Sequence, residues 1–149
     1  MNAILYCGIQ GAGKSTWYAA HHAATHLRLN LDMLRNRSRE AVLLHACLAV
    51  GQPFVVDNTN PGRETRRRYI AAAKAAGYSV EAIAFEVPLS LALSRNAGRT
   101  GKARVPDVAI RGTLAKLERV ELDEGYDRLV RVVLNEAGEA TVSEERPDV

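Results

Sequence analysis

The chain has 149 residues, of which 47% are hydrophobic and 25% are charged, with a net charge of +3. This length and composition are ordinary for one soluble globular domain and allow a full hydrophobic core. No apolar run approaches the length that crosses a bilayer, and the N-terminus lacks the features of a signal peptide. We therefore expect a cytoplasmic protein with no membrane partner, folded as a single domain over residues 1–149.

Two further features of composition bear on partners. Cys7 and Cys47 are far apart in apolar surroundings, which predicts core thiols rather than a disulfide or a metal pair. Residues 58–119 hold twelve Lys or Arg against five Asp or Glu, whereas residues 120–149 hold three against nine. The basic stretch could meet a polyanion such as nucleic acid, or it could be solvated helix faces together with arginines of a nucleotide site.

The first predicted element is an apolar strand over residues 2–7, followed by a glycine-rich loop and a helix to about Ala24. Residues 8–15 read G-x-x-x-x-G-K-S, a complete P-loop in the required strand–loop–helix context. Its backbone N–H groups would surround phosphate, Lys14 would reach the β- and γ-phosphates, and the Ser15 hydroxyl would bind Mg²⁺. The predicted nucleotide-binding residues of this loop are Gly8, Gly11, Ala12, Gly13, Lys14, Ser15 and Thr16.

A second strand is predicted over residues 25–31, and Asp32 and Arg35 follow it with the spacing D-x-x-R. The carboxyl ends of parallel strands face the ligand crevice, so Asp32 could accept the proton of an attacking hydroxyl. Arg35, about one helical turn away, would lie on the same side and hold an acceptor anion. The alternative is an ordinary surface acid and base at the start of a helix.

The third strand, residues 53–57, has four apolar positions that lead into Asp57. An acid at this place holds Mg²⁺ or its water shell in many P-loop proteins, although it could instead cap the loop that follows. Asn58 and Asn60 suit tight turns, which favours a structural role for both.

The remaining chain continues to alternate strands with helices, which predicts an α/β fold with a parallel central sheet flanked by helices. Ser38 and Asn60 are candidate N-caps. The predicted helices cover residues 38–51, 61–76, 88–97 and 107–122. The predicted strands cover residues 79–85 and 129–134, and a short strand near residues 141–142 falls within an acidic tail from about residue 135.

Residues 98–106 lack apolar periodicity and are rich in Gly, Lys and Arg. Arg95, Arg99, Lys102 and Arg104 surround this stretch, which we interpret as a mobile lid that closes over the triphosphate and neutralises its charge. The alternative is an exposed basic loop. The histidines at positions 21, 22 and 26 have no acid or cysteine near them in sequence, so we expect no metal site there.

These motifs together resemble the 5′-OH polynucleotide kinase family, known from a phage enzyme and an animal kinase/phosphatase. The resemblance covers roughly residues 1–119 in collinear order. It rests on four segments: the P-loop followed by Thr16, D-x-x-R at 32–35, Val-Val-Asp-Asn-Thr-Asn-Pro at 55–61, and Arg95-Asn96-x-x-Arg99 before Val105-Pro106.

The resemblance implies an ATP- and Mg²⁺-dependent P-loop kinase that phosphorylates the 5′-OH end of DNA or RNA. It implies that Asp32 is the general base and that Arg35 contacts the phosphate beside the acceptor nucleotide. Asp57 then belongs to the acceptor and metal region, and Arg99 is the lid arginine on the triphosphate, supported by Arg95. The implied catalytic residues are Lys14, Asp32, Arg35 and Arg99, and the implied metal ligands are Ser15 and Asp57.

The chain departs from those relatives because it has no D-x-D-G-T phosphatase motif. It should therefore be a kinase only, or the partner of a separately encoded phosphatase or ligase. Two alternatives stay open: a P-loop kinase of a small molecule or nucleoside, including a toxin-type kinase, and a nucleotide-binding ATPase module without an acceptor. A GTPase switch is disfavoured because no N-K-x-D guanine-reading motif is present.

Overall fold

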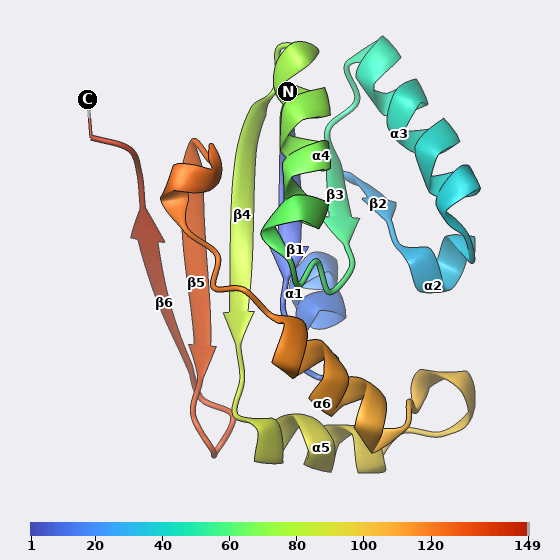
Figure 1. The fold of residues 1–149 in the computed structure, drawn as a ribbon, viewed down its shortest axis with the longest axis vertical. Helices are drawn as coiled ribbons and strands as arrows, with labels where there is room; N and C mark the ends of the chain where they lie inside the picture. Colours follow the sequence, from blue (N-terminus) through green and yellow to red (C-terminus); the bar gives the residue numbers. More distant parts are fainter. Residues whose placement is uncertain (149) are drawn as a thin grey trace.

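A single sheet of six strands forms the centre of the computed structural model, which describes residues 1–148 (Figure 1). The strand order is β2-β3-β1-β4-β5-β6. The first five strands in this order are parallel, and β6 runs antiparallel to β5. The strands are β1 (Asn2–Cys7), β2 (Leu27–Leu29), β3 (Phe54–Asp57), β4 (Ser79–Glu86), β5 (Arg128–Leu134) and β6 (Ala140–Glu145). The predicted α/β class with a mostly parallel sheet is confirmed.

The helices connect these strands. They are α1 (Lys14–His21), α2 (Leu31–Leu34), α3 (Arg37–Val50), α4 (Arg63–Ala75), α5 (Leu89–Ala97) and α6 (Asp107–Lys116). Two 3₁₀ turns, Gly101–Ala103 and Leu122–Glu124, follow α5 and α6 respectively. The sequence did not predict α2, and it placed the ends of α1 and α6 too late along the chain.

Two predicted helix caps were wrong. Asn36, rather than Ser38, caps α3, because its side-chain oxygen accepts a 2.8 Å hydrogen bond from the backbone N–H of Arg39. Gly62, rather than Asn60, precedes α4. Asn60 is buried with φ +44°, and its side-chain amide donates to the carbonyl of Tyr6 at 2.7 Å. The Asn60 side chain therefore forms a hydrogen bond with a distant strand instead of capping α4, the role that its local preference predicts.

The two faces of the sheet are covered by different helices, as the alternation along β1 requires. Ala3, Leu5 and Cys7 belong to the larger core cluster with residues of α3 and α4, including Cys47. Ile4 and Tyr6 face the other way and pack with side chains of α1. In Figure 1, α4 accordingly lies in front of the sheet and α1 behind it. Both cysteines are free and buried, as predicted.

Helices α5 and α6 lie beyond the carboxyl ends of the parallel strands (Figure 1). A small core cluster of Ile9, Ala92 and Ile110 joins the loop after β1 to both helices. Residues 98–106, the predicted lid (hereafter the lid segment), connect α5 to α6. Within residues 1–148 no helix is both long and apolar enough to cross a membrane.

Candidate functional site

The glycines of the P-loop hold a backbone that other residues would disturb. Gly8 has φ +157°, and a Cβ atom there would lie 2.8 Å from the carbonyl oxygen of Phe85. Gly11 has φ +81°, and a Cβ atom there would lie 3.1 Å from the carbonyl oxygen of Ala92. Close contact with β4 and α5 therefore fixes the loop from two sides.

The start of α1 leaves backbone donors available. Gly13 is the N-cap residue, with φ +98°, and no side chain caps the helix. Among residues 1–148, no acceptor takes a hydrogen bond from the backbone N–H groups of Gly13, Lys14, Ser15 or Thr16. Four unpaired donors and the positive end of a helix dipole make this turn a site for an anion such as phosphate.

Lys14 is held beneath the loop. Its Nζ donates to the carbonyl oxygens of Gly8 at 2.5 Å and Ile9 at 3.0 Å. Burial lowers the pKa of Lys14 to about 8, and the nearby Asp57 carboxylate partly opposes that shift. The ammonium group therefore lies at the loop in a poorly solvated place, where its charge acts strongly on a bound anion.

A cavity of about 330 Å³, the triphosphate cavity, opens between the P-loop, β2, α2, the segment after β3 and the lid segment. Most of the predicted site residues form its wall: Gly11, Ala12, Gly13, Lys14, Ser15, Thr16, Asp32, Asp57 and Arg99. Three others lie outside it. Gly8 is buried at the start of the loop, Arg95 lines a neighbouring cavity, and Arg35 is exposed to solvent.

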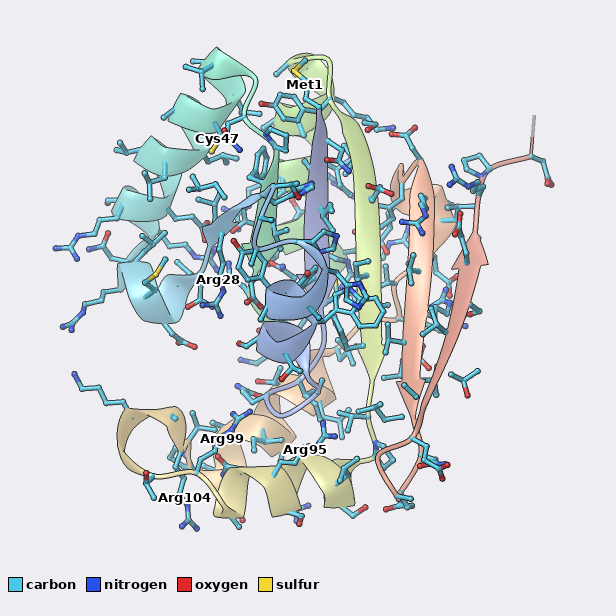
Figure 2. All side chains as sticks on the ribbon, turned by 180° about the vertical axis from the view of Figure 1, so that it is seen from behind. Met1, Arg28, Cys47, Arg95, Arg99 and Arg104 are labelled. Atoms are coloured by element: carbon cyan, nitrogen blue, oxygen red, sulfur yellow. The ribbon has the colours of Figure 1, made fainter. Side chains whose placement is uncertain are left out.

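Arg28, which sequence reasoning missed, joins the two predicted metal ligands. Its Nε lies 2.7 Å from Asp57 Oδ2, and one of its terminal nitrogens donates to Ser15 Oγ at 3.0 Å. The guanidinium carbon lies 5.6 Å from the centre of the Tyr18 ring. Figure 2 shows Arg28 between β2 and α1. Arg28 falls inside a predicted strand, where no spacing relates it to position 15 or 57.

The residues present fit a magnesium ion. Ser15 Oγ and Asp57 Oδ2 contact the same guanidinium, so the two oxygens converge on one cationic position. A hydroxyl and a carboxylate are suitable Mg²⁺ ligands, and Mg²⁺ usually takes only one or two protein groups beside substrate phosphates and water. No cluster of three or more His, Cys, Asp or Glu side chains in residues 1–148 offers an alternative metal site.

Asp32 reaches the triphosphate cavity from α2, a helix of four residues. Asn30 caps this helix by accepting from the backbone N–H of Met33 at 3.0 Å, and it donates to the carbonyl of Asp57 at 2.6 Å. The side chain of Asn58 accepts from the backbone N–H of Leu31 at 2.9 Å. These contacts fix Asp32 relative to the end of β3.

Arg35 does not share the wall of the cavity with Asp32. Arg35 ends α2 in the left-handed conformation, with φ +78°, and its side chain is exposed. The chain turns at this residue, so the two side chains do not both enter the cavity. The prediction from the one-turn spacing was therefore wrong. A positive φ is uncommon for residues other than glycine, and such residues often mark functional segments.

The arginines of the predicted lid differ in position. Arg95 donates to the carbonyl oxygen of Gly11 at 3.0 Å and is thereby tied to the P-loop. Arg99 borders the triphosphate cavity and the neighbouring cavity, whereas Lys102 and Arg104 are exposed and line neither. Figure 2 shows Arg95 and Arg99 on the P-loop side of α5 and Arg104 on the side away from it.

The neighbouring cavity, the side cavity, has a volume of about 360 Å³. It shares Gly11, Ala12, Gly13, Thr16 and Arg99 with the triphosphate cavity, and its other wall residues include Trp17, Phe85, Val132 and Leu134. Trp17 packs edge-on against Phe85, with ring centres 6.0 Å apart. An apolar, partly aromatic cavity beside a phosphate site can receive a flat aromatic group.

A buried arginine supports the segment behind the site. Arg66 of α4 is fully buried and donates to the carbonyl oxygens of Asn60 at 2.9 Å and Pro61 at 3.1 Å. Its Nε forms a 2.7 Å ion pair with Glu124, and another nitrogen donates to the carbonyl of Glu118 at 3.1 Å. Arg66 therefore stabilises the turn after Asp57 and does not face a ligand.

Comparison with known proteins agrees with this architecture. Residues 4–120 match a family described as an AAA domain. A sugar kinase from Janibacter sp. HTCC2649 superposes with a TM-score of 0.68 and 18% identity, over 89% of this chain and 85% of that one. A gluconokinase from Sinorhizobium meliloti 1021 gives 0.60 and 21%, over 89% and 82%.

A third structure, Chaetomium thermophilum Kti12 in complex with ADP-AlF3, gives a TM-score of 0.71 and 16% identity, over 91% of this chain and 92% of that one. At such identities the similarity establishes the fold and leaves the substrate open. None of the three is named a polynucleotide kinase.

Proposed function

The chain belongs to the AAA domain family with a P-loop kinase-like fold, and we propose that it transfers the γ-phosphoryl group of ATP to the 5′-OH end of DNA or RNA. One observation carries the proposal of a transferase. Lys14 on the P-loop side and Asp32 on the α2 side line the same cavity. The Asp32 carboxylate has no hydrogen-bond or ion-pair partner among residues 1–148, so it is available to accept a proton.

Different residues would position the donor, accept the proton and stabilise the charge during transfer. The four free N–H groups of residues 13–16 and the Lys14 ammonium position the triphosphate. Asp32 takes the proton of the acceptor hydroxyl while the hydroxyl oxygen bonds to the γ-phosphorus. The bond between the γ-phosphorus and the β–γ bridging oxygen breaks, and ADP leaves with that oxygen. Arg99, at the edge of the cavity, adds positive charge beside the transferring group. A magnesium ion on Ser15 and Asp57 would neutralise phosphate charge.

The side cavity suits the purine base of the donor. It joins the triphosphate cavity along the P-loop, and Trp17, Phe85, Val132 and Leu134 give it an apolar wall. A nucleoside triphosphate could therefore place its base there and its phosphates on the loop. This arrangement leaves the α2 side of the triphosphate cavity for the acceptor.

Two observations favour a polynucleotide acceptor. The first is the sequence resemblance at D-x-x-R and at residues 55–61. The second is the basic edge beside Asp32, where Arg35 and Arg39 are exposed, together with Arg37, which is exposed but pairs with Glu40 at 3.4 Å and donates to the Tyr69 hydroxyl at 2.9 Å. An acceptor longer than one nucleotide could place its 5′ end at Asp32 and its phosphates along these side chains. Arg35 would then act outside the cavity rather than within it.

The direct test incubates the protein with γ-labelled ATP, Mg²⁺ and DNA or RNA oligonucleotides that carry a 5′-OH. We expect label on the 5′ end of the 5′-OH oligonucleotides and none on matched oligonucleotides that already carry a 5′-phosphate. If ATP binds but no 5′-OH oligonucleotide is labelled, the polynucleotide acceptor is wrong. A separately encoded phosphatase or ligase partner would act on the ends before or after this kinase.

A kinase of a small hydroxylated molecule is the second candidate, because two proteins of similar fold are named sugar kinase and gluconokinase. The salt dependence of acceptor binding distinguishes the two candidate functions. Binding of a nucleic acid end should weaken steeply with salt as counterions are released, whereas binding of a neutral sugar should not. ADP release with a panel of sugars and sugar acids, at low and high salt, is the measurement.

A further inference from the structure

Arg28 occupies the position at which a divalent ion would bind. It contacts both candidate metal ligands, Asp57 Oδ2 at 2.7 Å and Ser15 Oγ at 3.0 Å. The side chain of Asp57 is only 2% exposed, and that of Arg28 is 28% exposed. A metal ion could therefore reach Asp57 Oδ2 and Ser15 together only if the guanidinium moved away.

The fold places this arginine there specifically. In the parallel pairing of β2 with β3, Arg28 lies opposite Val55, two residues before Asp57. Both side chains therefore lie on the α1 side of the sheet, where the P-loop presents Ser15. The Tyr18 ring, 5.6 Å from the guanidinium carbon, supports the arginine from α1.

The same geometry gives the guanidinium a route to leave. β2 is an edge strand of three residues, and it pairs only with β3 among residues 1–148. Arg28 also lines the triphosphate cavity, so its head group can swing toward a bound phosphate without unfolding the sheet. Arginine suits such a move because it stays charged in either position.

We propose that Arg28 is an internal cation that competes with the divalent metal for Ser15 and Asp57, and so sets how strongly metal and nucleotide promote each other's binding. The inference rests on the proposed function only through the nucleotide site. Without metal, Arg28 neutralises Asp57 and lets a triphosphate approach. With metal, the ion takes the two oxygens and Arg28 is displaced.

Removing the arginine should change the affinity for nucleotide in opposite directions in the absence and in the presence of metal. Metal-free nucleotide would meet an unpaired Asp57 carboxylate and bind more weakly. Metal-bound nucleotide would no longer compete with a guanidinium and would bind more tightly. The quantity to measure is therefore the coupling ratio, which is the Kd for a nucleotide in EDTA divided by its Kd in Mg²⁺.

Calorimetry with AMP-PNP, a non-hydrolysable ATP analogue, gives this ratio for the full chain. We expect Arg28→Met to raise the coupling ratio by about tenfold or more, and Arg28→Lys to fall between it and the wild type. Arg68→Met removes an equal charge from an exposed position on α4 and should leave the ratio unchanged. An unchanged or smaller ratio in Arg28→Met overturns the proposal.

A second readout needs no nucleotide. Electron paramagnetic resonance of Mn²⁺ should show tighter ion binding to nucleotide-free Arg28→Met than to the wild type, and equal binding would count against the proposal. Circular dichroism checks that each variant folds. Neither measurement involves an acceptor, so failure to phosphorylate oligonucleotides leaves the inference standing. Absence of AMP-PNP binding to the wild type would overturn both proposals.

Discussion

The two sides of the triphosphate cavity are built in different ways. The donor side, residues 8–16 with Arg95, is a backbone structure fixed by contacts with β4 and α5. The acceptor side, residues 27–35, is an edge strand of three residues and a helix of four, which carry Asp32 and Arg35 at exposed positions. Under the proposed function, the donor side would bind through N–H groups that any phosphate chain would satisfy, whereas the acceptor side would depend on individual side chains.

This difference has a consequence for specificity. A shift of the P-loop would require movement of the core, because its glycines touch the backbone of Phe85 and Ala92. A change on the acceptor side would alter only exposed side chains on a short helix. We therefore expect the donor to be constant and the acceptor to be readily changed.

The largest effect is expected from Asp32→Asn on the acceptor side. Loss of the general base should lower kcat by about 10²–10⁴-fold, while the Kd for AMP-PNP stays close to the wild-type value. Rapid-quench measurement of transfer and calorimetry test the two halves of this statement. Asp148→Asn, an exposed change in the tail, is the control. Full activity of Asp32→Asn would remove Asp32 from the role of base.

The next effect is expected at Arg66, which stabilises the turn after Asp57 behind the cavity. Arg66→Met should lower the free energy of unfolding by about 3–5 kcal/mol, because it leaves the Glu124 carboxylate buried without its partner. Urea unfolding followed by circular dichroism measures the change. Adding Glu124→Gln should restore part of the loss. If the single variant is as stable as the wild type, the pair does not anchor the turn after β3.

Lys14→Met tests the donor side. It should lower kcat/KM by about 10²–10³-fold and, unlike Asp32→Asn, should also weaken the binding of AMP-PNP. The physical reason is that Lys14 lines the triphosphate cavity, where its ammonium group would contact phosphate in both the ground state and the transition state. Calorimetry compares the AMP-PNP affinity of Lys14→Met with that of Asp32→Asn. Equal affinity in both variants would contradict the proposal that Lys14 binds the donor and Asp32 acts only on the acceptor.

The smallest effect is expected from Arg35→Met. Because Arg35 is exposed and outside the cavity, it should raise the KM for a 5′-OH oligonucleotide only several-fold, with kcat nearly unchanged. The slope of log K against log salt should become shallower by about one, as for the loss of one phosphate contact. An unchanged slope would place Arg35 away from the acceptor strand.

Local sequence determined much of this protein. The P-loop spacing predicted the loop at which the backbone N–H groups of residues 13–16 have no acceptor among residues 1–148, because that geometry depends on eight consecutive residues. The alternation of apolar strands and helices predicted a parallel α/β sheet. An apolar run that ends in an acid predicted that Asp57 lies at the carboxyl end of a strand of that sheet. These features depend on neighbours in the chain, so their signal lies within a short window.

Only the tertiary structure decided how distant segments meet. Arg28 reaches Ser15 and Asp57 because β2 pairs with β3 in one register and α1 packs over that face. Arg35 leaves the cavity because the chain turns at a positive φ. The side cavity forms where α1 and α5 meet β5 and the start of β6. Strand order and register arise from the summed packing of the whole core, and no local spacing encodes them.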